Sequence, residues 1–261
     1  MAKLYAMFDT HFHIFERGQA ISGARYVPDY RASLQNWQAE AALAGITHGI
    51  LVQPSFLGCN NQLLLDALAQ NKTSLRGVVV VSPSVTSAEL DAMDAIGARG
   101  IRLNLSGQSH DLAQWLQAPH LWEALLRLGW HVEVHTDQGA LPQVLAQLPT
   151  TIPLVIDHMG KPNAASAQDA SVVALCQRSK QSPVYVKLSG AYRLGGLSPS
   201  DIAQIWLGEL GVDRLLWGSD WPCTNFESEA NYAALRYALE DWVGLENQHS
   251  VLVTNPESLY G

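Results

Sequence analysis

The chain has few positive charges and no basic run. Its 261 residues contain 16 Lys and Arg against 24 Asp and Glu, which gives a formal net charge of −8. This balance lacks the electrostatic footprint of a nucleic-acid-binding protein. A few local arginines can still attract a small anion against the sign of the whole molecule. We therefore expect a small-molecule ligand and no nucleic-acid partner.

Cysteines and long apolar runs are also scarce. The three cysteines, Cys59, Cys176 and Cys223, show no CxxC spacing, which argues against a disulfide framework or a structural zinc site and favours a reducing compartment. The first residues, Met1–Asp9, are too short an apolar stretch for the core of a signal peptide. No stretch of about 18 apolar residues could span a bilayer. We expect a cytoplasmic protein that does not enter membranes.

Apolar residues instead occur in short runs that alternate with segments of helical periodicity. The eight runs are Tyr5–His11, Thr47–Gln53, Arg76–Val81, Gly100–Leu105, His131–His135, Pro153–Asp157, Val184–Leu188 and Arg214–Trp217. The helical segments are Ser33–Ala44, Asn61–Gln70, Ser87–Ile96, Leu121–Leu128, Ala140–Leu148, Ala170–Lys180, Ser200–Leu210 and Glu229–Trp242. Buried strands joined by helical crossovers are typical of a parallel sheet covered on both faces.

Eight such units predict an α/β fold, a parallel eight-stranded (β/α)₈ TIM barrel, as a single domain over residues 1–261. The length and the hydrophobic content of 48% suit one sizeable core. The alternative is a doubly wound open sheet. That fold would need a GxGxxG phosphate loop after the first strand, and the sequence has none there.

Catalytic groups of such a barrel gather at the carboxyl ends of the strands. The predicted strands one, five, six and eight end in polar phrases, which are Asp9–His13, His131–His135, Asp157–Gly160 and Trp217–Pro222. Because side chains alternate along a strand, His11 and His13 point to the same side, about 7 Å apart. With His135 and Asp220 they would make a ligand set for one Zn²⁺-like ion, which leaves His158 as a proton carrier.

A single histidine at a strand end is more often a structural residue, but here four of the nine histidines fall at such ends. The histidines expected at the surface are His48, His110, His120 and His249. His131 and Glu133 lie deeper in their strand, where we expect them to fill the barrel. We expect Cys223 to pack near Asp220 without a chemical role, and no GxSxG or GxCxG turn offers a nucleophile.

Together these strand ends resemble the amidohydrolase superfamily over the whole chain. The phrases that narrow the resemblance are Asp9–His13, Val52–Ser55, Arg99–Asn104, Asp157–Pro162, Lys187–Gly190, Gly218–Pro222 and Asn255–Gly261. They are similar to the branch that contains 2-pyrone-4,6-dicarboxylate hydrolase and related sugar lactonases.

The resemblance implies a hydrolase that opens a small carboxylated lactone, either a 2-pyrone-4,6-dicarboxylate-like compound or a sugar-acid lactone. It implies that Asp220 is the general base on the attacking water, while His11, His13 and His158 polarise the lactone carbonyl. An enol leaving group would need little acid help.

The resemblance also implies the substrate contacts. Arg102, at the end of strand four, and Arg193, just after strand seven, match residues that bind the substrate carboxylates, for which a planar guanidinium is suited. The alternative for each is a salt bridge at the barrel rim. Ser55, Tyr26 and Asn225 are placed like further substrate contacts.

The cofactor expectation stays open between no metal and one divalent ion, Zn or Mn. The pyrone-dicarboxylate hydrolases work without a metal and tend to lack a strand-five histidine, whereas this chain has His135 there. Arg102 and Asn104 stand where two-metal members carry a carbamylated lysine. We therefore expect at most a mononuclear site, held by His11, His13, His135 and Asp220.

Two other functions fit the same residues. Related amidohydrolase branches are metal-dependent decarboxylases with the same His and Asp constellation. The third hypothesis is a non-catalytic binding barrel. A site without catalytic function has no physical reason to keep five polar groups together, because their burial costs free energy.

Overall fold

The apolar runs form eight parallel strands that follow one another in chain order around one sheet. The computed structural model describes residues 5–261, so Met1–Leu4, part of the segment considered as a signal peptide, lie outside the described residues. The strands are β1 (Phe8–Phe12), β2 (His48–Val52), β3 (Leu75–Val79), β4 (Ala98–Asn104), β5 (His131–His135), β6 (Leu154–Ile156), β7 (Val184–Leu188) and β8 (Leu215–Trp217). Each pairs with its neighbour in parallel.

The sheet closes where the segment after β8 meets β1. The Asp220 amide donates to the His11 carbonyl at 2.8 Å, and the His13 amide donates to the Trp221 carbonyl at 2.8 Å. A parallel bridge joins Phe12 and Trp221. The prediction of a single-domain, eight-stranded TIM barrel is confirmed.

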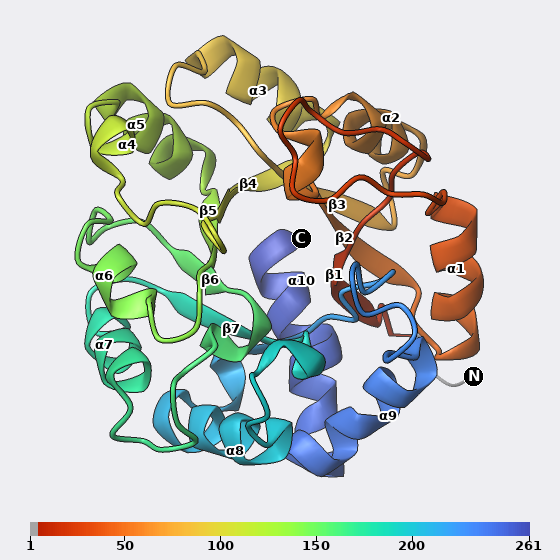
Figure 1. The fold of residues 1–261 in the computed structure, drawn as a ribbon, viewed down its shortest axis with the longest axis vertical. Helices are drawn as coiled ribbons and strands as arrows, with labels where there is room; N and C mark the ends of the chain where they lie inside the picture. The colour runs from red at the N-terminus through yellow and green to blue at the C-terminus, as the bar shows by residue number, and fades with distance from the viewer. Residues whose placement is uncertain (1–4) are drawn as a thin grey trace.

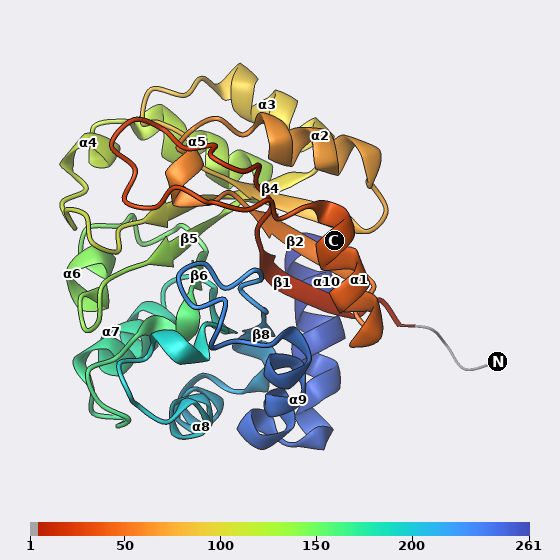
Figure 2. The same ribbon diagram turned by 45° about the vertical axis from the view of Figure 1, so that its right-hand side comes forward.

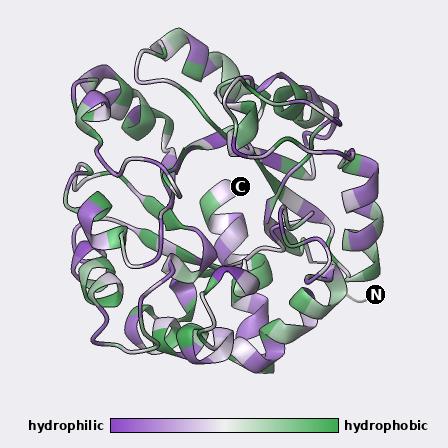
Figure 3. Cartoon of the chain, viewed as in Figure 1, coloured by the Kyte–Doolittle hydropathy of each residue, from purple (hydrophilic) through white to green (hydrophobic). Residues whose placement is uncertain are grey.

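Helices surround the ring of strands (Figure 1). They are α1 (Leu34–Leu43), α2 (Gln62–Gln70), α3 (Ser87–Ile96), α4 (Ala113–Leu116), α5 (Pro119–Leu128), α6 (Leu141–Leu145), α7 (Ala170–Arg178), α8 (Pro199–Leu210), α9 (Tyr232–Val243) and α10 (Asn255–Tyr260). Single turns are η1 (Ser55–Leu57), η2 (His158–Gly160), η3 (Ala191–Arg193), η4 (Val212–Arg214), η5 (Leu245–Asn247) and the π-turn η6 (Ser250–Thr254). Figure 3 shows that the surrounding helices carry both apolar and polar stretches, as their position between core and solvent requires.

Several element boundaries differ from the prediction. The first strand begins at Phe8 rather than at Tyr5. Helix α9 begins after Asn231, whose side chain accepts a hydrogen bond from the Ala234 amide and so caps the helix later than expected. The short helix α4 and the terminal α10 were not predicted, because each is too short to show a helical period. None of the helices formed by residues 5–261 is long and apolar enough to cross a bilayer.

The two ends of the barrel are closed differently. Figure 1 shows α10 inside the ring of strands, and its Tyr260 is fully buried. The Tyr260 ring meets the ring of His131, the first residue of β5, with 5.3 Å between centroids. At the opposite end the segment between β1 and α1 reaches the loop after β4, where Arg25 donates to the Ser106 carbonyl (Figure 2). The barrel is therefore plugged at the amino ends of its strands and roofed by loops at the carboxyl ends.

Candidate active site

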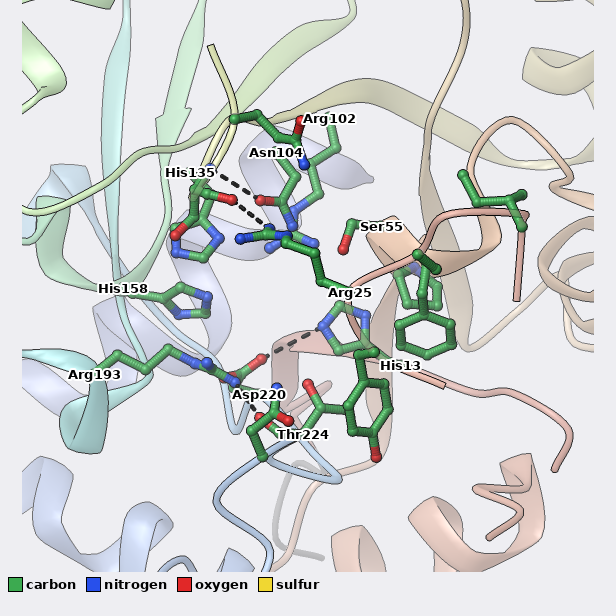
Figure 4. A pocket seen from close by; sticks show the side chains of 18 of the residues that line it. His13, Arg25, Ser55, Arg102, Asn104, His135, His158, Arg193, Asp220 and Thr224 are labelled. Carbon is green, nitrogen blue, oxygen red and sulfur yellow. Dashed lines mark hydrogen bonds and ion pairs between the residues drawn. The ribbon is translucent and has the colours of Figure 1, made fainter. Parts of the chain in front are cut away.

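A cavity of about 540 Å³ opens at the carboxyl ends of the strands. All the predicted site residues except His11 line it, namely His13, Tyr26, Ser55, Arg102, His135, His158, Arg193, Asp220 and Asn225. His11 is fully buried beside it. Figure 4 shows Asp220 and His13 facing each other across one part of the cavity, with His158 nearby.

His11 and His13 meet Asp220 at one point. The two Nε2 atoms are 3.2 Å apart, and Asp220 Oδ1 lies 3.6 Å from His11 Nε2 and 3.4 Å from His13 Nε2. The alternation of side chains along β1 places both rings on the inner side of the barrel. Asp220, in the segment after β8, supplies the carboxylate. Residues more than 200 positions apart in the sequence therefore form one cluster.

Asp9 holds these two chain segments together. Its Oδ1 accepts hydrogen bonds from the amides of Ser219, at 2.9 Å, and His11, at 3.1 Å, while its Oδ2 accepts from the Ser219 hydroxyl at 2.6 Å. Gly218 allows the close approach, because a Cβ there would lie 2.6 Å from His11 Cβ. The relative position of His11 and Asp220 thus depends on these backbone contacts.

The other ring nitrogens define the protonation of the pair. His13 Nδ1 lies 2.7 Å from the Val52 carbonyl and must donate to it. His11 Nδ1 lies 3.1 Å from Asp157 Oδ1 and 3.2 Å from Lys187 Nζ, and because an ammonium group can only donate, Nδ1 accepts that hydrogen bond. The proton of the His11 ring then lies on Nε2, which can donate to His13 Nε2 at 3.2 Å, and both Nε2 atoms face Asp220 Oδ1. Two imidazole nitrogens and one carboxylate oxygen that converge in this way form a ligand set for a cation, which would displace the His11 Nε2 proton.

Asp220 is held in an ionised state. Arg193 Nε donates to its Oδ2 at 2.7 Å, and the Tyr192 hydroxyl donates to the same oxygen at 2.8 Å. Burial alone would raise the pKa of Asp220, but the charge of Arg193 holds that pKa well below its usual range. Asp220 has a positive φ of 58°, an uncommon conformation that turns its side chain into the cavity.

His158 is a neutral imidazole. Burial lowers its pKa to about 3. The Ser189 hydroxyl oxygen accepts the His158 amide at 3.3 Å and lies 3.0 Å from Nδ1, to which it can donate its own proton. This arrangement leaves the imidazole proton on Nε2. His158 therefore offers a neutral hydrogen-bond donor rather than a titrating proton carrier at neutral pH.

His135 is separated from the other predicted metal ligands. Its ring packs edge-on against His158, with 4.6 Å between centroids, and its ligand atoms group with those of His158 and Asp157. Both its ring nitrogens are buried and have no hydrogen-bond partner among the described residues. The structure thus brings His11, His13 and Asp220 of the predicted set together, and leaves His135 as an unsatisfied donor on the same wall.

These residues fit a divalent cation. Ligand atoms of a tetrahedral zinc site are roughly 3.4 Å apart, as follows from bonds of about 2.0–2.1 Å. The separations of 3.2–3.6 Å among His11, His13 and Asp220 match that spacing. The donor set of two imidazoles and one carboxylate suits zinc or manganese.

Both predicted substrate arginines are already ion-paired. Arg102 is buried and donates through Nη2 and Nε to Asp157 Oδ2, at 2.9 and 3.1 Å, and its Nε lies 3.5 Å from Glu133 Oε1. Arg193 binds Asp220 as described and donates to the Thr224 carbonyl at 3.0 Å. Each still lines the cavity, so the salt bridge and the substrate contact are not exclusive.

The remaining predicted contacts lie on the cavity wall. Ser55 begins η1, three residues after the end of β2. The Tyr26 hydroxyl donates to Glu227 Oε1 at 3.0 Å. Asn225 has a left-handed backbone with φ of 69° in the loop after β8. Cys223, expected to pack, is buried and does not line the cavity.

Sequence reasoning missed Lys187 and Arg25. Lys187 lies near the carboxyl end of β7, is fully buried, and pairs with Glu133 Oε2. Its Nζ is also 3.2 Å from His11 Nδ1. A lysine inside an apolar strand run could have indicated this, because a buried ammonium group needs a partner. Arg25 gave no such signal, since it stands in a loop. Glu133, expected to fill the barrel, does so as the partner of Lys187.

The chain is similar to known proteins over nearly its whole length. The Amidohydrolase family model matches residues 8–261. A 2-pyrone-4,6-dicarboxylate hydrolase from Comamonas testosteroni is 28% identical, over 97% of this chain and 89% of the relative. A 4-sulfomuconolactone hydrolase from Hydrogenophaga intermedia is 30% identical, over 97% of this chain and 88% of the relative.

A solved structure gives the same result. The crystal structure of a probable 2-pyrone-4,6-dicarboxylic acid hydrolase from Acinetobacter baumannii, with citric acid bound, is 33% identical and has a TM-score of 0.87. The match covers 98% of this chain and 99% of that one. The likeness thus extends over the barrel and all the strand ends that carry the site. The chain belongs to the amidohydrolase family.

Proposed function

We propose that the chain is a hydrolase that opens a small carboxylated lactone. The observation that carries the proposal is the convergence of ionised Asp220 with the Nε2 atoms of His11 and His13 beside a cavity that also holds neutral His158. The names of two relatives support it, since both are lactone hydrolases whose compounds carry acidic groups. The citric acid in the Acinetobacter protein adds a carboxylate ligand in a related barrel.

The residues suggest a simple sequence of steps. A water molecule attacks the lactone carbonyl carbon while Asp220 Oδ1 accepts one of its protons. The Nε2 proton of His158 stabilises the negative charge that develops on the carbonyl oxygen. The ring C–O bond then breaks, its oxygen leaves with the electron pair, and the proton held by Asp220 passes to the product.

Asp220 is a weak base, because Arg193 and Tyr192 occupy its second oxygen. Positioning of the water therefore contributes more than basicity, and the interactions that hold Oδ2 fix the direction of Oδ1. A divalent ion held by His11, His13 and Asp220 would supply Lewis-acid polarisation of the carbonyl when bound. Arg193 also lies close enough to the reacting centre to contact a carboxylate of the substrate.

The test is turnover of a panel of pyrone carboxylates and sugar-acid lactones, with and without added Zn²⁺ or Mn²⁺. We expect at least one compound to be opened, and we expect Asp220→Asn to lower kcat by about 10³-fold, as loss of a general base does. Asp241→Asn is the matched control, because Asp241 is exposed on α9 away from the cavity.

The outcomes separate the alternatives. No ring opening of any compound under either condition would refute the lactonase. Release of CO₂ without a ring-opened product would select the decarboxylase. If Asp220→Asn changed neither turnover nor ligand affinity, the binding barrel would be favoured.

A further inference from the structure

The cations around the cavity differ in whether they are neutralised. Arg102 pairs with Asp157, and Arg193 pairs with Asp220. A substrate carboxylate that approaches one of these groups also meets the negative charge of its partner. The carboxylate therefore gains less binding free energy from such a pair than from contact with an unpaired cation.

Arg25 is different. It lines the same cavity, and none of the carboxylates among residues 5–261 lies within ion-pairing distance of its guanidinium. Its one hydrogen bond to the described residues is donated to the Ser106 carbonyl, which leaves most of its five N–H donors free. Arg25 is exposed to solvent and stands at the cavity mouth, where it supplies a positive charge that no carboxylate of the described residues neutralises.

The position of the guanidinium is defined by the opposite wall. Arg25 comes from the segment between β1 and α1, and its side chain extends across the cavity toward the loop after β4 (Figure 4). Gly107 in that loop lies under the guanidinium, and a Cβ at this position would clash with it. Asn104 and Gln108, from the same loop, add amide groups to the lining.

This position lies across the barrel from the reacting groups. Asp220 follows β8, and the β4 loop that receives Arg25 is four strands away around an eight-stranded ring. A molecule whose carbonyl meets Asp220 and His158 therefore presents its far end to Arg25.

We propose that Arg25, with the loop after β4, forms an anion subsite that selects lactones carrying a second acidic group at the end remote from the ester. The inference rests on the proposed lactonase function for its substrate class. The subsite itself binds a carboxylate whether or not a lactone is opened, because its guanidinium has no competing acid.

The experiment uses Arg25→Gln, which removes the charge but keeps much of the length, and Arg25→Lys, which keeps the charge but loses the planar fork. Arg17→Ala is the control, because Arg17 stands exposed in the same segment and does not line the cavity. Citrate binding is measured by calorimetry, and kcat and KM are measured for matched lactones with one and two carboxylates.

We expect Arg25→Gln to weaken citrate binding and to raise KM for the dicarboxylate by about 10- to 100-fold, as loss of a charged hydrogen-bonding partner does, with kcat changed less than about threefold. The monocarboxylate should be affected much less. Arg25→Lys should fall between, and Arg17→Ala should behave as the parent protein.

Two results would overturn the subsite. One is citrate affinity that is absent in the parent protein or unchanged in Arg25→Gln. The other is an equal loss for both lactones, which would make Arg25 a general part of the cavity roof. If citrate binds through Arg25 but no lactone is opened, the subsite stands and the lactonase function fails. If lactones are opened without any dependence on Arg25, the lactonase function stands and the subsite fails.

Discussion

At the scale of single residues, the least expected feature is the charged network below the cavity. Lys187 and Glu133 are fully buried and paired with each other, and Asp157 joins them, with its Oδ1 3.7 Å from Lys187 Nζ. Asp157 Oδ1 lies 3.1 Å from His11 Nδ1, and Lys187 Nζ lies 3.2 Å from the same nitrogen and donates to it. The network therefore fixes which His11 nitrogen faces Asp220, although it does not touch the cavity centre.

We predict that Lys187→Met lowers the free energy of unfolding by about 3–5 kcal/mol, because it leaves two buried carboxylates with one cation fewer. The measurement is urea unfolding at pH 7. Lys180→Met, at an exposed position after α7, should change it by less than about 0.5 kcal/mol. The pair Lys187→Met with Glu133→Gln should recover much of the loss, since it removes both charges together. A single Lys187→Met variant as stable as the parent would contradict this view.

At the scale of elements, α10 closes the barrel floor. Tyr260 packs in a buried cluster with residues from several strands, which are Phe8, Ile50, Val52, Val78, Val155, Tyr185 and Leu216. Its hydroxyl has no hydrogen-bond partner among the described residues. The side chain therefore contributes through packing and not through a hydrogen bond.

This contrast gives a matched pair of variants. Tyr260→Ala should cost about 3–5 kcal/mol, because it opens a cavity in the floor that the strands cannot close. Tyr260→Phe should change stability by less than about 1 kcal/mol, since the hydroxyl leaves no partner behind. Thermal unfolding of both variants and of the parent protein measures these changes in stability. A large loss in Tyr260→Phe would show that the hydroxyl has a partner after all.

At the scale of the whole molecule, buried neutral histidines make the fold sensitive to acid. Burial, assisted by Lys187, lowers the pKa of His131 from 6.5 to about 3, and burial lowers that of His158 to about 3. Between these values the unfolded chain binds protons that the folded chain does not. The contribution of these neutral histidines to the free energy of unfolding is therefore complete above pH 6.5, and it is lost as the pH drops from 6.5 toward 3.

We predict that the free energy of unfolding falls by about 1.4 kcal/mol per pH unit for each such histidine over this range. Urea unfolding between pH 7 and pH 4 measures the slope. His131→Phe should reduce the slope by about one proton, whereas His120→Phe, at an exposed position on α5, should leave it unchanged. An identical slope in His131→Phe would mean that His131 already carries its proton in the folded protein.

Local sequence was enough to predict the elements and the polar strand ends. The apolar runs and helical periods report which segments are buried, and these patterns depend on neighbouring residues. The alternation along β1 placed His11 and His13 on one side, and the barrel then placed the ends of β1, β6 and β8 together. That is why the cluster of His11, His13, His158 and Asp220 could be anticipated before any contact was known.

Tertiary structure alone decided how charge is distributed around that cluster. Lys187 meets His11 across 176 positions of the chain, and Arg25 meets Ser106 across 81 positions. Such pairs leave no periodic trace, because electrostatic partners are chosen by proximity in space. The sequence by itself determined the barrel and the groups at its mouth. Only the folded structure determined that Arg102 and Arg193 are neutralised by Asp157 and Asp220 and that Arg25 is not.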